Sequence, residues 1–458
     1  MLCIYFNEFH VLSSIGITIF YIKVLFGKIN MKRYLHRYLD EQLADILEYM
    51  GAVLIVGPKW CGKTTTAKQL AGSIIQLQDP KHSKSYLKLA DVDPLSLLEG
   101  KKPRLIDEWQ MAPELWDAVR YSVDESDRFG LYILTGSTVV DDSKIMHSGA
   151  GRIHRMLMRP MSLYESKESN GNISLMELFD NPNLNINGIT SDLTIPDLIF
   201  AMCRGGWPET LNIKDKQHQL NIAKFYLDVL CEVDTTTIDG VKRNPDKVKA
   251  LLKSYSRNIS SFTKNTMIIE DIREHHGLMS EATYYDYINV LKQLFIIDEI
   301  KAWGPQIRSK TAMRNSSKKN FIDPSIAVAS LDLTPEKILY DLDTGEHIFE
   351  SLCIRDLNVY SSERGGKILQ YHDQSDLEVD CVLTLSNGDY ALIEFKLGSR
   401  EEEDAAKNLL KLKKIINKKR ASNEIKIPEP KFLAIITGGK VALTRDDGVK
   451  VIPIGCLR

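Results

Sequence analysis

The chain has 458 residues, of which 43% are hydrophobic and 26% charged, and its formal net charge is −2. This length predicts about two to four folded domains, and the composition is typical of a globular protein. Because the net charge is near zero, the chain as a whole has no strong field that would draw it to nucleic acid or to a membrane surface. Binding of a polyanion would therefore depend on local basic patches.

The cysteines are scattered along the chain, and no two of them have the C-x-x-C spacing. They are Cys3, Cys61, Cys203, Cys231, Cys353, Cys381 and Cys456. This distribution is typical neither of a disulfide framework nor of a zinc site, and it suits a reducing compartment. We therefore expect a cytoplasmic protein.

Residues 1–30 differ from the rest of the chain. The segment 11–27 is apolar except for Lys23 and a few small polar residues. It is shorter than the roughly 20 apolar residues of a membrane-spanning helix, and it lacks the basic start and cleavage site of a signal peptide. Since Met31 opens a plausible native start, we interpret residues 1–30 as an extension upstream of the true reading frame. The alternative is a weak anchor, and no stable membrane insertion is expected.

A glycine-rich loop follows the apolar segment 52–56, which reads as a buried strand. Residues 57–64 have the form G-x-x-x-x-G-K-T of a P-loop. Its backbone N–H groups would turn toward a phosphate chain, and the next helix would direct its positive end at the same anion. Lys63 would reach the β and γ phosphates, and the Thr64 hydroxyl would hold Mg²⁺. The residues expected to contact nucleotide are Gly57, Pro58, Lys59, Trp60, Cys61, Gly62, Lys63, Thr64 and Thr65.

Further strands are predicted at 85–89, 104–108 and 131–135, with helical stretches between them. This order indicates a parallel sheet with crossover helices, in which ligands gather at the carboxyl ends of the strands. Asp107 and Glu108 lie at such an end. Asp107 would help to hold Mg²⁺, and Glu108 would orient or deprotonate an attacking water. The alternative is a pair of solvated acids at an exposed strand end.

Ser137 and two arginines complete the candidates in this region. The Ser137 hydroxyl would sense the γ phosphate, or else it is an ordinary loop serine. Arg152 and Arg155 follow a glycine-rich segment, and a guanidinium there would stabilise transition-state charge on the phosphoryl group. It would act in its own chain or in a neighbouring copy, and the second case implies a homo-oligomer. A solvated basic loop is the alternative.

Residues from about 31 to 165 resemble the AAA-plus-like ATPase domain of a bacterial and archaeal family. The matching segments are 57–64, 105–110, 134–137 and 151–152, the last followed by 157–165. The resemblance implies that Asp107 and Glu108 form a Walker B site, that Ser137 is a sensor and that Arg152 is an arginine finger. It also implies ATP and Mg²⁺ as cofactors and ATP hydrolysis as the activity. We recognise no second sensor arginine, so a lid-domain mechanism has no candidate residue.

The middle of the chain is predicted to be helical after an irregular connection. Residues 166–200 are rich in Asn, Ser, Asp and Pro, which is typical of a linker, and helical pattern returns near 214–231. We expect a linker and helical region at 166–245 and a winged-helix-like region at 246–315. The second consists of a helix, a turn, another helix and a strand at 295–300.

The predicted second helix of the winged-helix-like region, 280–294, carries few basic residues, with Lys292 the main one. A structural role therefore suits this helix better than DNA reading, because phosphate contacts usually need Lys and Arg. The better candidate for electrostatic contact with DNA or RNA is a basic stretch that follows, and the alternative is a solvated tether. Its residues are Arg308, Lys310, Arg314, Lys318 and Lys319.

The last predicted domain, 316–458, has the element order helix, three strands, helix, strand. The elements are expected at 346–359, 367–372, 377–385, 389–397, 401–418 and 431–437. A three-residue loop with a left-handed Gly388 joins the two central strands, because that register buries both apolar sets together. Asp380 then lies opposite Glu394, with Cβ atoms about 5 Å apart. Two acids at that distance repel each other unless a cation lies between them.

The carboxylates and a lysine on this hairpin suit metal-assisted hydrolysis of a phosphodiester. A divalent ion held by Asp380 and Glu394, with Glu350 as a further ligand, would activate water. Lys396 would stabilise the phosphorane or position the nucleophile. The alternative is a sheet face of solvated ion pairs, in which Lys396 answers Glu378 and Glu394.

Asp380 and the sequence Glu394-Phe395-Lys396 resemble the acidic signature of the restriction-endonuclease-like fold, although Val379 replaces the usual proline. The family named above commonly carries such a C-terminal domain, so the resemblance extends over most of 31–458. It implies an α/β protein: a P-loop parallel sheet with helices on both faces, a helical middle and a restriction-endonuclease-like domain. Two functions follow as hypotheses. One is an ATPase coupled to a domain that binds or cleaves nucleic acid, and the other is an ATP-dependent conformational switch whose nuclease-like domain is inactive.

Overall fold

The computed structural model describes residues 34–138, 149–238, 240–304, 317–373 and 375–458. Residues His36–Arg458 form one compact unit. The expected N-terminal extension and Arg308, Lys310 and Arg314 of the basic stretch lie outside the described residues. None of the helices in the described part of the chain is long and apolar enough to cross a membrane.

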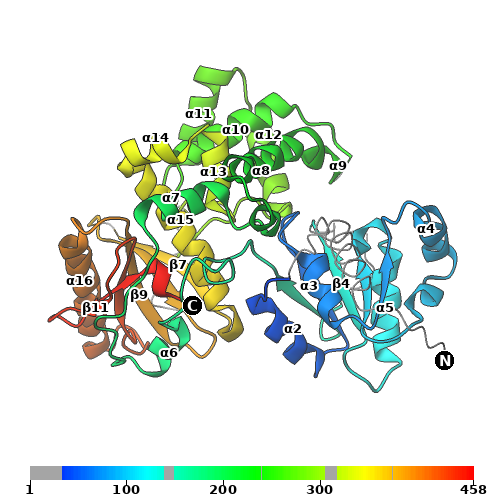
Figure 1. Cartoon of the computed structure of the whole chain (residues 1–458), viewed down its shortest axis with the longest axis horizontal. Coiled ribbons are helices and arrows are strands. Elements are labelled where there is room, and N and C mark those ends of the chain that lie inside the picture. The colour runs from blue at the N-terminus through cyan, green and yellow to red at the C-terminus, as the bar shows by residue number, and fades with distance from the viewer. Residues whose placement is uncertain (1–33, 139–148, 239, 305–316, 374) are drawn as a thin grey trace, which may run out of the picture. The chain divides into compact units, whose positions relative to one another are not determined.

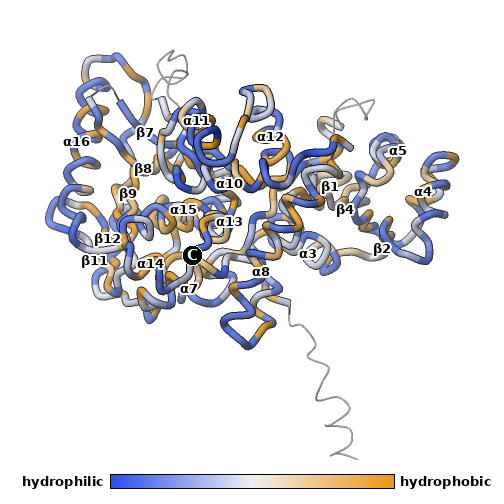
Figure 2. Tube along the Cα trace, turned by 90° about the horizontal axis from the view of Figure 1, so that it is seen from above, coloured by the Kyte–Doolittle hydropathy of each residue, from blue (hydrophilic) through white to orange (hydrophobic). Residues whose placement is uncertain are grey.

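The first sheet has five strands in the order β2-β3-β4-β1-β5, and all its pairings are parallel. The strands are β1 (Ala52–Val56), β2 (Ser73–Gln76), β3 (Arg104–Asp107), β4 (Tyr132–Gly136) and β5 (Ile153–Leu157). The helices around it are α2 (Tyr38–Leu47), α3 (Lys63–Leu70), α4 (Ser83–Val92) and α5 (Glu114–Asp124). β1 is apolar along its whole length, as is typical of a strand that is covered on both faces; its hydropathy can be followed in Figure 2.

Alternate side chains of this sheet enter two separate cores. Val53 and Ile55 of β1 pack with residues of α2 and α3, whereas Leu54 packs with residues of α4 and α5. Both faces of the sheet are therefore covered by helices (Figure 1), and the predicted fold class of this part is confirmed.

The strand predicted at 85–89 is wrong, because this segment belongs to helix α4. Tyr86, Leu87 and Ala90 turn toward the core, at the spacing of one helical face, while Leu89 is exposed. The edge strand of the sheet is β2 instead, where Ile75 is buried.

The middle of the described chain is helical. Its helices are α6 (Leu175–Asp180), α7 (Ile195–Arg204), α8 (Lys216–Val229), α9 (Thr235–Thr237), α10 (Pro245–Arg257), α11 (Asn265–His276), α12 (Glu281–Gln293), α13 (Pro324–Ser330) and α14 (Pro335–Tyr340). The helix pair α11 and α12 lies where a winged-helix-like pair was predicted. The strand predicted at 295–300 forms only isolated bridges, at Ile297 and Ile300, and Phe295 at its start has φ +58°. A left-handed residue cannot continue an extended strand, so regular pairing begins only at β6 (Lys301–Ala302).

The segment 166–200, predicted as a linker, is instead built into the C-terminal core. Helix α6 begins after Ser174, whose side chain accepts a hydrogen bond from Glu177 N–H. Leu178 and Phe179 are buried, and the Phe179 ring lies 5.0 Å from that of Phe432, centroid to centroid. The segment is rich in polar residues, but its few apolar residues have helical spacing, and this spacing decides that it packs into the core.

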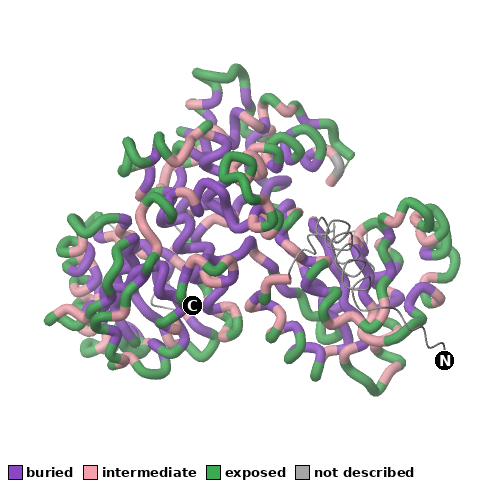
Figure 3. The backbone as a smooth tube through the Cα atoms, viewed as in Figure 1, coloured by how far each residue is buried: buried purple, intermediate pink, exposed green. Residues whose placement is uncertain are grey.

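The C-terminal sheet has seven strands in the order β11-β12-β10-β9-β8-β7-β6. Beside β6 they are β7 (Lys367–His372), β8 (Glu378–Thr384), β9 (Tyr390–Lys396), β10 (Leu433–Thr437), β11 (Leu443–Thr444) and β12 (Lys450–Pro453). Helices α15 (Leu342–Tyr360) and α16 (Glu402–Ala421) cover opposite faces (Figure 1), and the strands between them are largely buried (Figure 3). This mixed α/β sheet agrees with the predicted elements, to which β11 and β12 are added.

The predicted register of the central hairpin is confirmed near its turn. Cys381 pairs with Ile393, Leu385 donates its N–H to Asp389 O, and Gly388 has φ +89°. The regular alternation ends beyond Cys381, because the β7–β8 pairing shifts by one residue there and Val379 enters the core on the α16 side. A bulge of this kind re-aims the side chains around it, and it lies at Asp380.

Candidate functional site

The P-loop leaves the carboxyl end of β1 and leads into α3. Gly57 and Gly62 have φ +151° and +106°, and Trp60 between them has φ +66°. A Cβ atom on Gly57 would lie 2.2 Å from the Met158 carbonyl oxygen, so only glycine fits at this position. The first turn of α3 carries no acidic residue, which leaves its positive end open to an anion.

Lys63 is folded back onto its own loop. Its side chain is 5% exposed, and Nζ donates hydrogen bonds of 2.9 Å to both the Gly57 and the Pro58 carbonyl oxygens. An ammonium in this position is close to the concave side of the loop and would exchange these carbonyls for phosphate oxygens on nucleotide binding.

Thr64 and Asp107 meet at the carboxyl end of the sheet, as the P-loop interpretation requires. Thr64 Oγ1 donates a 2.6 Å hydrogen bond to Asp107 Oδ1, and Thr135 Oγ1 donates another of 2.6 Å to the same oxygen. Hydroxyl and carboxylate oxygens are the ligands that Mg²⁺ prefers. The chemistry of this donor set therefore fits a magnesium ion beside a bound triphosphate.

Glu108 is held in a strained conformation next to Ser137. It has φ +56°, and its N–H donates to Thr135 Oγ1 at 3.1 Å. Ser137 Oγ donates to Glu108 Oε2 at 3.1 Å, and the Gln110 amide donates to the same oxygen. Backbone strain in a non-glycine residue is concentrated at functional sites, and here it turns the carboxylate toward the sensor candidate. Gln110 is a contact that the sequence interpretation did not assign.

Arg152 and Arg155 are not brought to the P-loop. Arg152 O accepts a hydrogen bond from Ala52 N–H, so this residue lies at the amino end of β1, the opposite end of the strand from the loop. Its guanidinium pairs with Asp124 at 2.7 Å. Arg155 lies within β5, with its guanidinium 5.2 Å from the Trp116 ring centroid. Because β5 runs parallel to β1, Arg152 as a finger within its own chain is a prediction that the fold corrects.

The arginine that does reach the P-loop is Arg37, which the sequence interpretation missed. It is buried, and it donates hydrogen bonds of 2.8 Å to the carbonyl oxygens of Cys61 and Arg159. Its Nε lies 3.0 Å from Glu165 Oε1. Arg37 thus ties the loop to the segment that leaves β5; no motif in the sequence marks it.

The outer side of the P-loop contacts the helical region. Lys59 pairs with Asp234 at 2.5 Å. The Trp60 ring lies 5.8 Å from that of Tyr226, which lies 4.5 Å from that of Trp207. No sequence pattern indicates this contact, because the partners lie far along the chain.

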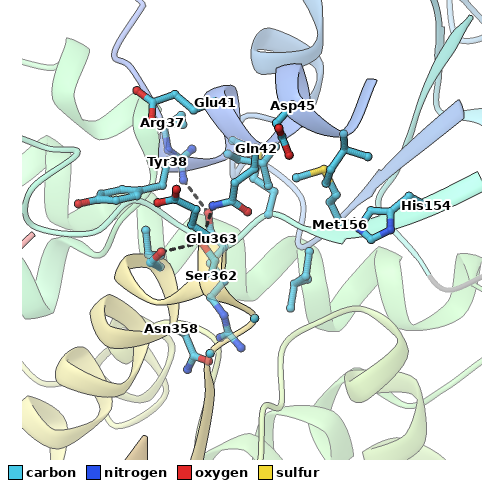
Figure 4. Close-up of a pocket in the computed structure, with 18 of the residues that line it drawn as sticks. Arg37, Tyr38, Glu41, Gln42, Asp45, His154, Met156, Asn358, Ser362 and Glu363 are labelled. Carbon is cyan, nitrogen blue, oxygen red and sulfur yellow. Dashed lines mark hydrogen bonds between the residues drawn. The ribbon is translucent and has the colours of Figure 1, made fainter. Parts of the chain in front are cut away.

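One cavity in the described part of the chain has no P-loop residue in its lining. It has a volume of about 730 Å³ and is lined by α2, β5 and residues near Asn358–Glu363 (Figure 4). Gln42 and Ser362 form a 2.7 Å hydrogen bond within it. The chemistry of the P-loop suits a nucleotide better than the lining of this cavity does.

In the C-terminal domain, the cation between the carboxylates is a lysine of the chain itself. Lys318 Nζ lies 2.7 Å from Glu350 Oε1, 2.9 Å from Glu378 Oε1 and 2.9 Å from Asp380 Oδ1. The other Asp380 oxygen accepts the Phe395 N–H at 3.1 Å. Lys318 was predicted as part of a basic stretch for nucleic acid or a solvated tether, and both interpretations are wrong for this buried side chain.

The acids of this cluster differ in pKa and therefore in whether they hold a proton. Burial raises the pKa of Glu350 to about 8, although Lys318 opposes the shift. Burial likewise disfavours the Asp380 carboxylate, but Lys318 and a hydrogen bond with Glu394 prevail and lower the Asp380 pKa to about 2. Burial and the neighbouring Asp380 raise the pKa of Glu394 well above its usual range. Asp380 therefore keeps its charge while Glu394 holds a proton.

Lys396 and Lys319 also differ from their predicted roles. Lys396 pairs with Glu346 at 3.1 Å and Glu401 at 3.0 Å, not with the carboxylates of the hairpin face. Lys319 is buried and pairs with Glu299 at 3.0 Å. In the described part of the chain, no group of three His, Cys, Asp or Glu side chains is placed to hold a metal ion. The predicted site of Asp380, Glu394 and Glu350 does not fit a metal, because Lys318 takes the acceptor oxygens.

Three family models match consecutive parts of the chain. Residues 50–167 match the AAA domain, 195–337 match a domain of unknown function (DUF8612), and 346–457 match another domain of unknown function (DUF4143). The first match and the loop geometry together support ATP binding by an AAA-like P-loop domain. The search of curated proteins found no match.

Several solved structures show a distant likeness. The Walker-type ATPase PABY2304 of Pyrococcus abyssi is 17% identical, with a TM-score of 0.39, over 64% of this chain and 94% of that one. A STAND protein with a tetratricopeptide repeat sensor, PH0952 from Pyrococcus horikoshii, is 13% identical, with a TM-score of 0.23, over 72% and 49%. Drosophila ORC bound to DNA is 10% identical, with a TM-score of 0.16, over 67% and 93%.

Proposed function

We propose that this protein is a Mg²⁺-dependent ATPase that works as a nucleotide-driven conformational switch. The observation that carries the proposal is the 2.6 Å hydrogen bond between Thr64 Oγ1 and Asp107 Oδ1. It joins the hydroxyl of the loop to the acid of the next strand at the place where P-loop enzymes hold the metal of their nucleotide.

The roles of the remaining residues follow from their positions. Mg²⁺ held by Thr64 and Asp107 would neutralise charge on the phosphates. Glu108 would orient or deprotonate the attacking water, and Ser137, which donates to Glu108, would register the γ phosphate. Lys63 would bind the β and γ phosphates after leaving the two loop carbonyls that it now contacts.

The switch is supported by the contacts on the outer side of the loop. Nucleotide binding would release Lys63 from the Gly57 and Pro58 carbonyls and so alter the loop between the two glycines. Two residues of that loop, Lys59 and Trp60, contact Asp234 and Tyr226 of the helical region. A change in loop conformation would therefore alter these contacts directly. The helical region in turn shares α13 with the core beneath the C-terminal sheet.

The test is ATP binding and hydrolysis by single variants. Lys63→Ala is expected to lose ATP binding, because the phosphate ligand is removed. Glu108→Gln is expected to bind ATP normally and to hydrolyse it about 10²- to 10⁴-fold more slowly, the usual contribution of a general base. The control is Glu125→Gln, an exposed acid at the end of α5, which should behave as wild type. Unchanged hydrolysis in both site variants would refute the proposal.

A contribution from Arg152 would require a second copy of the chain, since it lies away from its own loop. We propose a homo-oligomer only in that case. Arg152→Ala should then lower hydrolysis without changing ATP binding, and hydrolysis per chain should rise with protein concentration. If the variant hydrolyses ATP at the wild-type rate, Arg152 has no such role.

For the C-terminal domain, the geometry supports a binding module better than a nuclease. Its element order and the neighbouring Asp380 and Glu394 still resemble a restriction-endonuclease-like site, but Lys318 neutralises it from within. We expect no cleavage of DNA or RNA with Mg²⁺ or Mn²⁺. Cleavage that is lost on Asp380→Ala would favour the nuclease instead.

A further inference from the structure

We propose that Lys318 is a built-in cation that occupies the position of a divalent metal among the carboxylates of the C-terminal domain. The domain then uses the Asp380 carboxylate for an ionic contact within the chain, with Glu350 and Glu378 beside it, and does not bind a metal ion there. This inference rests on the proposed non-cleaving role of the domain, and it assigns that role to one residue.

Three carboxyl groups surround the Lys318 ammonium, and Asp380 accepts a hydrogen bond from it. The ammonium has three N–H donors, and the carboxyl groups lie at 2.7 to 2.9 Å from Nζ. They come from α15 (Glu350) and β8 (Glu378 and Asp380). The Lys318 side chain is 2% exposed, and two of its acceptors, on Glu350 and Asp380, are largely shielded from solvent, whereas Glu378 is partly exposed. A divalent ion could reach the same oxygens only by displacing a buried positive charge from its partners.

The backbone holds Lys318 in this position. Its N–H donates to Ile300 O at 2.9 Å, and its carbonyl accepts the Ile300 N–H at 3.0 Å. The next residue, Lys319, exchanges backbone hydrogen bonds with Ser260 and Ser261 of the helical region. The Phe262 ring centroid lies 5.6 Å from Lys318 Nζ. The lysine is therefore presented to the sheet from outside it, and its ion pairs join the helical region to the C-terminal domain.

The bulge in β8 lies at Asp380, the second of the two acids of that strand that meet the ammonium. Glu378 and Asp380 are two residues apart and would share one face of a regular strand. The shift in the β7–β8 pairing falls between Val379 and Val382 and so includes Asp380. At this shift, Asp380 Oδ2 accepts a hydrogen bond from Phe395 N–H, and Asp380 Oδ1 accepts one from Lys318 Nζ.

The experiment measures Mn²⁺ binding to the full-length chain without nucleotide, by electron paramagnetic resonance and by calorimetry. Wild type and Asp380→Asn should show the same Mn²⁺ binding. Lys318→Ala should gain one additional Mn²⁺ per chain and a higher melting temperature in Mn²⁺, because three carboxylates are left without their cation. The double variant Lys318→Ala/Asp380→Asn should lose that gain. Lys319→Ala, a neighbouring buried lysine that pairs with Glu299, is the matched control and should gain nothing.

Two results would overturn the inference. One is Mn²⁺ binding by wild type that disappears in Asp380→Asn, because a metal would then share the site with the lysine. The other is a folded Lys318→Ala that gains no Mn²⁺. If Lys318→Ala does not fold, Lys318→Gln replaces it, and the comparison of wild type with Asp380→Asn remains decisive. ATP hydrolysis, measured separately on the same samples, should be unchanged, so failure here is distinct from failure of the ATPase proposal.

Discussion

A buried cluster of ionic side chains beneath the helical region should contribute measurably to the free energy of unfolding. The Asp323 side chain is fully buried. Its Oδ1 accepts hydrogen bonds from Ser325 N–H at 3.0 Å and from Ser325 Oγ at 2.6 Å. Its Oδ2 accepts hydrogen bonds from Gly206 N–H at 2.9 Å and from Arg355 Nη1 at 3.0 Å. Arg355 also pairs with Asp356 at 2.7 Å. The cluster thus fixes Gly206, which precedes the Trp207 that contacts Tyr226 beside the P-loop.

The perturbation is Asp323→Ala. Removal of one partner from a buried ion pair costs about 3–5 kcal/mol, because the other charge is left buried. Since Asp356 still pairs with Arg355, we expect the lower end, a decrease of about 3 kcal/mol in the free energy of unfolding. The double variant Asp323→Ala/Arg355→Met should lose less than the sum of the two single variants, because no orphaned guanidinium remains.

The assay is equilibrium urea denaturation, followed by both fluorescence and circular dichroism so that a two-state analysis can be checked. The matched control is Asp180→Ala, which breaks an exposed aspartate–arginine pair with Arg364 and should cost about 1 kcal/mol or less. If Asp323→Ala costs no more than Asp180→Ala, the cluster does not hold the helical region together as we reason.

Three further predictions concern the hairpin, a buried acid and the thiols. Gly388→Ala should lower the free energy of unfolding in urea by about 1 kcal/mol, because φ is +89° at this residue. The control is Gly398→Ala, where a Cβ atom would also meet no neighbour but the backbone is outside the left-handed region. It should cost almost nothing, and equal costs would contradict the predicted turn. Burial disfavours the Glu299 carboxylate, but Lys292 and Lys319 outweigh it and lower the pKa of Glu299. The resulting contribution to the free energy of unfolding is present above the usual glutamate pKa and is lost as the pH falls below it. Glu299→Gln should therefore weaken the decrease in stability at acid pH, and an unchanged decrease would count against the pairing. Burial raises the pKa of Cys203 and Cys231 to about 12. In a Cys3→Ser variant the thiols should therefore react with Ellman's reagent at pH 8 only after unfolding. Rapid labelling of the native protein would refute this.

Features that depend on neighbouring residues could be predicted from the amino-acid sequence. The P-loop, its strand and its helix follow from eight consecutive residues behind an apolar run, and the turn at Gly388 follows from alternation on two adjacent strands. In each case the interacting groups are close in the chain, so pattern and spacing specify the geometry. The error at 85–89 arose in a short segment, where apolar residues suit a strand and a helix equally well until their partners are known.

Which distant charges meet could not be predicted in this way, because it depends on how remote segments pack. Arg152 was predicted at the nucleotide, but the parallel pairing of β5 with β1 puts it at the other end of the strand. The cation required between the acids of the C-terminal hairpin was predicted to be a metal, whereas the fold supplies Lys318 from 62 residues before Asp380. A buried charge is matched by whichever partner the packing of remote segments brings within reach, and no local pattern records that choice.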